Sequence, residues 1–141
     1  MIVGFTGSRS EPTAQQLDWL RETLVRVRVT EFHHGDCIGA DAAAHTVVRR
    51  LGPEIRVVIH PPTNPQYRAF CFGDETLPEA EYLERNRVIV RSCKLLLALP
   101  SGPEYKRSGT WSTIRFARRL RKERMICLPD GSVRSTIRDK R

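Results

Sequence analysis

The chain has 141 residues, 40% of them hydrophobic and 28% charged, a balance that fits one globular domain and argues against a disordered or fibrous protein. Its longest apolar run, Leu95–Leu99, is strand-sized and far short of the roughly 20 residues that a membrane-spanning helix needs. The formal net charge of +8 and the pI of about 9.9 indicate attraction to phosphates or polyanions. The first residues lack the basic segment of a signal peptide, so we expect no membrane partner and a cytoplasmic location.

The predicted elements alternate between strands and helices from the start of the chain. A strand over residues 2–6 leads through a Gly/Ser turn to a helix over 12–27, whose leucines recur at spacings of three and four. A short polar strand over 31–34 precedes a helix over 40–51, which Gly52 and Pro53 end. A third strand covers 55–60. Residues 61–80, rich in Pro, Gly and acids, form the longest irregular stretch, and such long loops are often functional.

The alternation continues to the end of the chain. The sequence predicts a helix over 81–92, a strand over 94–99, a Gly/Pro loop over 100–107, a helix over 109–122 and a strand over 125–128. Strands that alternate with helices predict right-handed βαβ units. We therefore expect an α/β fold, a three-layer Rossmann-like domain with a mainly parallel sheet. One domain over residues 1–131 is expected, followed by a basic C-terminal tail over 132–141 with Arg134, Arg138, Lys140 and Arg141.

Three loops each follow a predicted strand, precede a helix and consist largely of Gly, Ser, Thr and Asp. They cover residues 6–10, 35–41 and 108–113. Glycine lets backbone N–H groups approach an anion closely, and a helix N-terminus adds the positive end of its dipole. Such loops gather at the carboxyl edge of a parallel sheet, where ligands bind. The candidate nucleotide- or phosphate-binding residues in them are Gly7, Ser8, Arg9, Gly35, Asp36, Gly39, Ala40, Ser108, Gly109, Thr110 and Thr113.

Several polar residues of these loops allow two interpretations. Asp41 begins a helix, where the dipole stabilises an acid, so capping of that helix is its expected role. Asp36 follows the glycine that opens the second loop, where it can accept a hydrogen bond from a ribose hydroxyl. Ser108 and Thr110 either cap the next helix or contact phosphate. His34, at the end of its strand, is placed to meet a ligand.

The helix predicted over 81–92 adds two candidates. Arg85 and Arg87 diverge by about 200° around a helix, so one of them faces the ligand edge while the other is solvated. Asn86 is mildly unfavourable inside a helix, which favours a specific hydrogen-bonding role. Arg85 and Asn86 therefore join the candidate binding residues.

The cysteines give no sign of a metal site. They stand at positions 37, 71, 93 and 127, form no C-x-x-C pair and match no histidine spacing. We expect neither a metal nor a cofactor. Cys93 and Cys127 lie beside apolar runs, which predicts buried thiols.

Basic residues concentrate in the helix predicted over 109–122, where Arg115, Arg118, Arg119 and Lys122 recur at helical spacing. This stripe is either a solvated helix face or a surface for nucleic acid. Aromatic residues make up only 7% of the chain, which argues against stacking platforms for single strands, so only weak DNA binding is expected.

Residues 35–45, 85–89 and 107–113 resemble the signature blocks of the SLOG superfamily. That superfamily unites the DNA-processing protein DprA (Smf) with the Lonely Guy phosphoribohydrolases. The blocks recur in the family's order across residues 1–131, with the greatest likeness to small stand-alone SLOG proteins of bacteria and phages. The resemblance implies a Rossmann-like sheet whose loops bind a nucleotide, a nucleotide-derived signal or DNA. It also implies a homo-oligomer.

The sequence departs from the Lonely Guy pattern at its catalytic block. Thr113 stands where those enzymes carry a catalytic glutamate, and Thr cannot serve as that carboxylate. Glu84 and Glu104 are the nearest carboxylates that offer a substitute. We therefore expect a nucleotide or nucleotide-derivative binding protein. The alternatives are an N-glycosidic hydrolase of nucleoside monophosphates and a DprA-like DNA-binding accessory protein.

Overall fold

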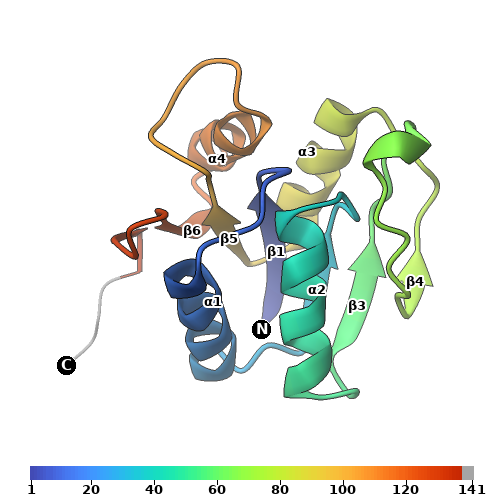
Figure 1. Cartoon of the computed structure of the whole chain (residues 1–141), viewed down its shortest axis with the longest axis horizontal. Coiled ribbons are helices and arrows are strands. Elements are labelled where there is room, and N and C mark those ends of the chain that lie inside the picture. The colour runs from blue at the N-terminus through green and yellow to red at the C-terminus, as the bar shows by residue number, and fades with distance from the viewer. Residues whose placement is uncertain (138–141) are drawn as a thin grey trace.

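The computed structural model describes residues 1–137 and shows an α/β domain (Figure 1). Its elements are β1 (Ile2–Gly7), α1 (Ala14–Arg26), β2 (Glu31–His34), α2 (Ala40–Leu51), β3 (Arg56–Ile59), the 3₁₀ turn η1 (Pro65–Tyr67), β4 (Glu75–Thr76), α3 (Tyr82–Ser92), β5 (Leu95–Leu99), α4 (Gly109–Arg119), β6 (Glu123–Cys127) and β7 (Val133–Ser135). Across residues 1–137, no helix has both the length and the apolar character to cross a membrane.

The seven strands form one sheet in the order β4-β3-β2-β1-β5-β6-β7. Every neighbouring pair is parallel except β6 and β7, which are antiparallel. The chain builds one half of the sheet from β1 to β4 and then returns to the other side of β1 with β5. The strand order therefore reverses between β1 and β5, where open α/β sheets bind ligands.

Helices cover both faces of the sheet, which gives the three expected layers. Alternate residues of β5 show this, because Leu95 and Leu97 pack in one cluster with residues of α1 and α2. Leu96 and Ala98 point the other way, into two clusters with residues of α3 and α4. Figure 1 shows α1 and α2 side by side on one face. The predicted Rossmann-like α/β fold with a mainly parallel sheet is confirmed.

A buried glutamine ties the first helix to the strand ends near the cavity described below. Thr13 caps α1, since its hydroxyl accepts from Gln16 N (3.2 Å) while Gln16 Oε1 accepts from Thr13 N (3.0 Å). The amide nitrogen of Gln16 then donates to the carbonyl oxygens of Pro100 and Cys127, both at 2.8 Å. Because these carbonyls follow or end β5 and β6, this capping box also fixes the carboxyl edge of the sheet.

Most boundaries lie within two residues of the predicted ones, and three differences are larger. The helix predicted over 109–122 ends at Arg119, because Arg121 adopts a left-handed conformation (φ 56°) that no α-helix continues. β4 lies inside the stretch predicted as irregular, and β7 lies inside the predicted tail. Neither is apolar enough to show a strand pattern, since all three residues of β7 are exposed. Of the tail's basic residues, Arg138, Lys140 and Arg141 lie outside the described residues.

Candidate functional site

A cavity of about 370 Å³ opens at the carboxyl edge of the sheet, around the ends of β1 and β5. The end of β1, the loops after β1, β2 and β5, and the N-terminal parts of α2, α3 and α4 line it. The predicted binding residues among its lining are Gly7, Ser8, Arg9, Gly35, Arg85, Asn86, Ser108, Gly109 and Thr110. The fold thus brings together nine residues that are spread over more than a hundred positions of the sequence.

Four predicted binding residues lie outside the cavity lining. Gly39 has a left-handed φ of 92°, and a Cβ there would overlap the backbone of Arg9. Ala40 is buried and donates its N–H to Ser8 O at 3.0 Å, so both residues hold the start of α2 against the loop after β1. The hydroxyl of Thr113 donates to Gly109 O (2.9 Å) within α4.

The fourth is Asp36, which the sequence predicted to face a ribose. Its side chain is fully buried and accepts from Arg68 Nε (2.9 Å) and from Cys71 N (2.8 Å). Ala69 N also donates to the carbonyl oxygen of Asp36 at 2.7 Å. The carboxylate therefore anchors the long loop between β3 and α3 and does not border the cavity.

Asp41 is the only carboxylate among the lining residues. It stands in the first turn of α2, is 6% exposed, and accepts from Cys37 N at 3.1 Å. Burial raises the pKa of Asp41 to about 6, although the nearby Arg85 guanidinium opposes the shift. The predicted capping role is wrong, because Gly39 is the N-cap of α2 and no side chain caps this helix. The sequence also did not predict the carboxylate's place in the cavity.

Arg85 brings a buried positive charge to the cavity wall. It is 6% exposed, and its Nη1 donates to the carbonyl oxygens of Gly35 and His60. Both terminal nitrogens lie near Cys37 Sγ, at 3.5 and 3.6 Å, while Nε has no hydrogen-bond partner in the described chain. No carboxylate of residues 1–137 lies within ion-pair distance of it. Asp41 offsets this buried charge only from beyond ion-pair distance, and an anion in the cavity would offset it further.

The N-terminus of α4 opens onto the same cavity. Ser108 is its N-cap, since its hydroxyl accepts from Trp111 N at 3.1 Å. The amides of Gly109 and Thr110, in the first turn, have no acceptor within the helix, and that turn contains no acid. Arg9 and Arg107 also line this space. The region therefore suits an anion, whereas the first turn of α2 carries an acid of its own, Asp41.

The two arginines of α3 diverge as expected. Arg85 points into the protein, and Arg87 is exposed with its guanidinium 5.3 Å from the centre of the Phe116 ring. Asn86 borders both the cavity and a small hollow between α3 and α4. The substitute carboxylates lie elsewhere: Glu84 is exposed and outside the lining, and Glu104 pairs with Arg115 at 3.1 Å.

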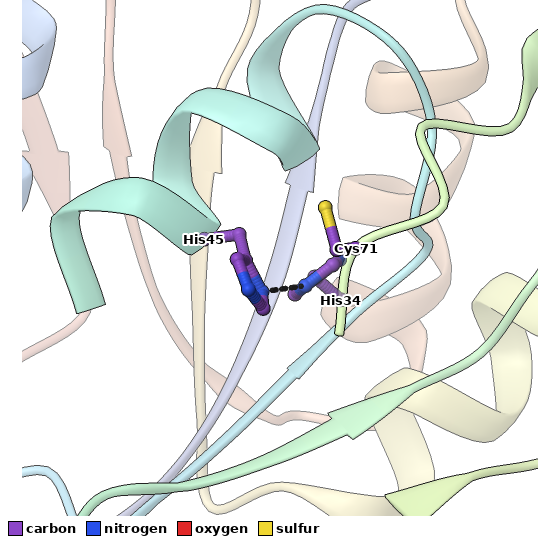
Figure 2. Close-up of side chains that lie close together, drawn as sticks. All are labelled: His34, His45 and Cys71. Carbon is purple, nitrogen blue, oxygen red and sulfur yellow. Dashed lines mark hydrogen bonds between the residues drawn. The ribbon is translucent and has the colours of Figure 1, made fainter. Parts of the chain in front are cut away.

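A cluster that the sequence gave no reason to expect lies beneath the second loop. Ligand atoms of His34, His45 and Cys71 lie within 4.8 Å of one another (Figure 2). His34 Nδ1 accepts from Asp36 N (2.9 Å), so neutral His34 carries its proton on Nε2 and donates it to His45 Nδ1 at 3.0 Å. A protonated Nε2 cannot coordinate a metal, and burial holds the pKa of His34 well below its usual value. The cluster is thus a hydrogen-bonded support for the loop, and His34 does not border the cavity.

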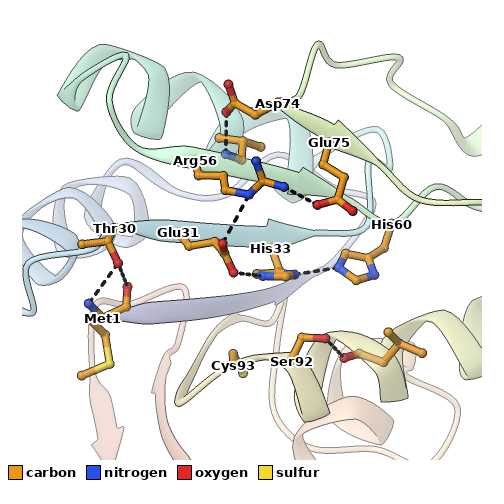
Figure 3. Close-up of polar contacts among 12 residues, drawn as sticks. Met1, Thr30, Glu31, His33, Arg56, His60, Asp74, Glu75, Ser92 and Cys93 are labelled. Atoms are coloured by element: carbon orange, nitrogen blue, oxygen red, sulfur yellow. Dashed lines mark hydrogen bonds and ion pairs between the residues drawn. The ribbon is translucent and has the colours of Figure 1, made fainter.

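A second histidine chain crosses the other face of the sheet (Figure 3). His33 Nε2 lies 2.7 Å from Glu31 Oε2, and His33 Nδ1 lies 2.8 Å from His60 Nε2. Burial, with a smaller contribution from His33, lowers the pKa of His60 to about 4. Arg56 joins Glu31 to Glu75, so the chain of contacts links β2, β3 and β4.

The sequence matches no protein-family model and no curated protein. The structure resembles that of the molybdenum cofactor binding protein from Rippkaea orientalis, with a TM-score of 0.70 and 18% identity over 90% of this chain and 76% of that one. It also resembles DprA from Streptococcus pneumoniae, with a TM-score of 0.65 and 17% identity over 89% of this chain and 49% of that one. DprA from Helicobacter pylori gives a TM-score of 0.60 and 17% identity over 89% and 64% of the two chains. The chain therefore shares the Rossmann-like fold of these proteins, as its resemblance to DprA predicted.

Proposed function

We propose that the cavity binds a nucleotide or a nucleotide derivative through its phosphate. The observation that carries this proposal is Arg85, a buried cation in the cavity wall with an unpartnered Nε and no carboxylate of the described chain in ion-pair reach. The acid-free start of α4 supplies amides and the positive end of a dipole to the same space. A volume of about 370 Å³ lies within the range of small-molecule sites.

The fold neighbours support a ligand of this class. The Rippkaea orientalis protein is described as binding the molybdenum cofactor, and its structure covers most of this chain. The cavity of this chain also stands where the strand order reverses, as ligand sites of open parallel sheets do. Its lining carries hydroxyls at Ser8, Ser101 and Ser108 as further donors for phosphate oxygens.

The first test is to denature the purified protein and identify any released nucleotide by mass spectrometry. The second is calorimetry of that nucleotide with Arg85→Gln, beside Arg87→Gln as the matched control. Both changes remove one arginine charge from α3, but only Arg85 lines the cavity. Arg85→Gln should weaken binding roughly 10- to 150-fold, the value of one or two charged hydrogen bonds, and Arg87→Gln should not. Equal affinities in folded proteins would refute the proposal.

A second candidate function is binding of single-stranded DNA at the arginine cluster, which we define as Arg87, Arg91 and Arg119. All three guanidinium groups lie 5.3 to 5.8 Å from the centre of the Phe116 ring, and all three are exposed. None forms an ion pair with a described carboxylate. The structure of the Helicobacter pylori fold neighbour is described by its single-stranded DNA binding mode.

The arginine cluster replaces the stripe predicted on α4. Arg115 and Arg118 lie 3.1 and 3.9 Å from Glu104, and Lys122 donates to the carbonyl oxygen of Cys93. Only Arg119 of the four is left without such a partner among the described residues. The surface available to phosphates is therefore built by α3 and α4 together, and we expect weak, salt-sensitive binding there.

We also propose a homo-oligomer, as the SLOG resemblance implies. Phe70 is 63% exposed and Phe72 is 87% exposed on the loop between β3 and α3. Two exposed aromatic rings so close in the chain favour a covered surface. Light scattering after gel filtration should give a mass above that of the 16.2 kDa chain, and Phe72→Ser should lower it.

A further inference from the structure

The cavity has one acceptor-rich group among many donors. Asp41 is its single carboxylate, whereas arginines, hydroxyls and amides make up most of the polar lining. A carboxylate has about four lone-pair sites, and the amides of Cys37 and Gly35 use only part of that capacity. A ligand with a hydrogen-bond donor placed at Asp41 would use this remaining capacity.

Phosphate cannot be that group, because it would be repelled by the carboxylate. The acid-free start of α4 and the arginines of the lining, Arg85 among them, attract the phosphate instead. The part of a nucleotide that meets Asp41 is then its sugar or its base.

The aromatic residues of the lining indicate whether the sugar or the base meets Asp41. The cavity's exposed aromatic side chains are Tyr82 and Tyr105, 41% and 55% exposed, which places them at the rim on α3 and on the loop after β5. A base stacks on such a rim, where one face of each ring is open. Asp41 is only 6% exposed and is therefore far less open to solvent than either ring. A ribose between phosphate and base can present two adjacent hydroxyl groups to the two oxygens of one carboxylate.

We infer that Asp41 binds the ribose hydroxyl groups of the ligand, so that the cavity selects ribonucleotides over sugars that lack those hydroxyls. This inference rests on the proposed nucleotide function. It moves to Asp41 the role that the sequence predicted for Asp36, whose oxygens are occupied by Arg68 and Cys71. Carboxylates take the same role in dinucleotide-binding sheets of this architecture.

The test is calorimetry with the 5′-monophosphates of all four bases, each as the ribose, 2′-deoxyribose and 2′,3′-dideoxyribose form. The wild type should bind the dideoxy form roughly 10- to 150-fold more weakly than the ribose form, whichever base it carries. In Asp41→Asn this ratio should fall below about threefold, because the amide keeps one acceptor and loses the charge. Glu84→Gln is the matched control, since it removes an exposed acid next to Arg85 and should keep the wild-type ratio.

Each other outcome overturns the inference. Equal binding of ribose and dideoxyribose forms by the wild type shows that Asp41 does not read the sugar, and this measurement needs no variant. If Asp41→Asn keeps the wild-type ratio of ribose to dideoxyribose affinity, another group binds the sugar hydroxyls. A loss in Asp41→Asn that varies with the base and not with the sugar assigns Asp41 to the base. Failure of every monophosphate to bind the wild type overturns the proposed function together with the inference.

Discussion

Arg85 packs its guanidinium against the Cα of Gly35 and donates Nη1 to the carbonyl oxygen of the same residue. A Cβ at position 35 would overlap Nη1. The arginine cannot move aside freely, because it is buried and also bonded to His60 O. Gly35→Ala should therefore displace Arg85, lower the free energy of unfolding by about 1–3 kcal/mol and weaken nucleotide binding about as much as Arg85→Gln does.

The control for this prediction is Gly102→Ala. Gly102 belongs to the loop after β5, and no atom lies within 4 Å of the place where its Cβ would be. Urea denaturation should find its stability within about 0.5 kcal/mol of the wild type, as for most surface substitutions. If Gly35→Ala changes the free energy of unfolding as little as Gly102→Ala does, the packing of Arg85 on Gly35 does not contribute to stability.

Gly109→Val tests the phosphate end of the cavity. Gly109 begins α4 and borders the cavity, and a Cβ there would lie 3.2 Å from Cε2 of Tyr82. Tyr82 is partly exposed and can shift, so the fold should survive. The added methyl groups should keep phosphate away from the first amides of α4, and calorimetry should show loss of nucleotide binding. Unchanged affinity in a folded Gly109→Val protein would remove this helix start from the site.

The loops of the site could be predicted because their composition alone marks them. Gly, Ser and Thr at three strand–helix junctions indicate ligand loops in any parallel sheet. The 200° divergence on the helix predicted that one of Arg85 and Arg87 faces the ligand edge, without saying which. Asp41 was predicted only as a helix-start acid. Sequence cannot separate that role from a ligand-binding one, because both place a carboxylate in the first turn.

Contacts between residues far apart in the chain explain the features of the site that could not be predicted from the sequence. Asp36 turns away from the cavity because Arg68 and Cys71, 32 and 35 positions further on, bind its carboxylate. His34 and His45 meet through a spacing that no metal motif shares. Arg115 of the basic stripe predicted on α4 is paired with Glu104, which lies in the preceding loop. Tertiary contacts of this kind have no periodic signal in the sequence.

The hydrolase alternative predicts a measurable product. Thr113 binds its own helix backbone, and neither Glu84 nor Glu104 lines the cavity. We expect no release of ribose 5-phosphate from AMP, GMP, CMP or UMP above background. Turnover that disappears in Asp41→Asn but persists in Glu84→Gln and Glu104→Gln would instead show that Asp41 supplies the missing carboxylate.

Asp41 should also make stability depend on pH. Its pKa is about 6 in the folded protein and 3.8 as an ordinary carboxyl, so the folded state holds a proton over an interval where the unfolded state has lost it. Stability contributed by this group therefore falls as pH rises from about 4 to about 6, by at most about 3 kcal/mol. Asp41→Asn should be more stable than the wild type at pH 7.5 and similar to it near pH 4. A gain of equal size at both pH values in urea denaturation would contradict this assignment.

The buried histidines should lower the stability of the protein as the pH falls, whereas Asp41 raises it. Burial lowers the pKa values of His34, His45 and His60 below 6.5, to about 4 for His60. The unfolded chain then binds more protons as pH falls below 6.5, so these groups destabilise the protein in acid. Because Asp41 partly offsets this loss, stability should fall more steeply between pH 6.5 and 4.5 in Asp41→Asn than in the wild type. Parallel pH profiles of the two proteins would show that Asp41 takes up no proton on folding, and an Asp41→Asn protein that loses no stability between pH 6.5 and 4.5 would show that the histidines do not stay neutral.

The arginine cluster can be separated from bulk charge by two triple variants of equal net charge. One changes Arg87, Arg91 and Arg119 to Gln. The other changes Arg21, Arg26 and Arg50, exposed residues of α1 and α2 on the opposite face of the sheet. Only the first should weaken the binding of single-stranded DNA, and it should reduce the salt dependence by up to about 2 units of log K per log salt.

Neither triple variant should change mononucleotide affinity more than about twofold, since none of the six arginines lines the cavity. Equal losses of DNA binding in both would show that the overall charge of +8 attracts DNA without a defined surface. The wild type should bind DNA weakly and release it as salt is added, because counterion release is the main source of affinity. Tight binding that persists at about 0.3 M salt, where the Debye length is under roughly 8 Å, would contradict this expectation. It would require contacts to bases, and the exposed Tyr82 and Tyr105 at the cavity rim would then be the first rings to replace.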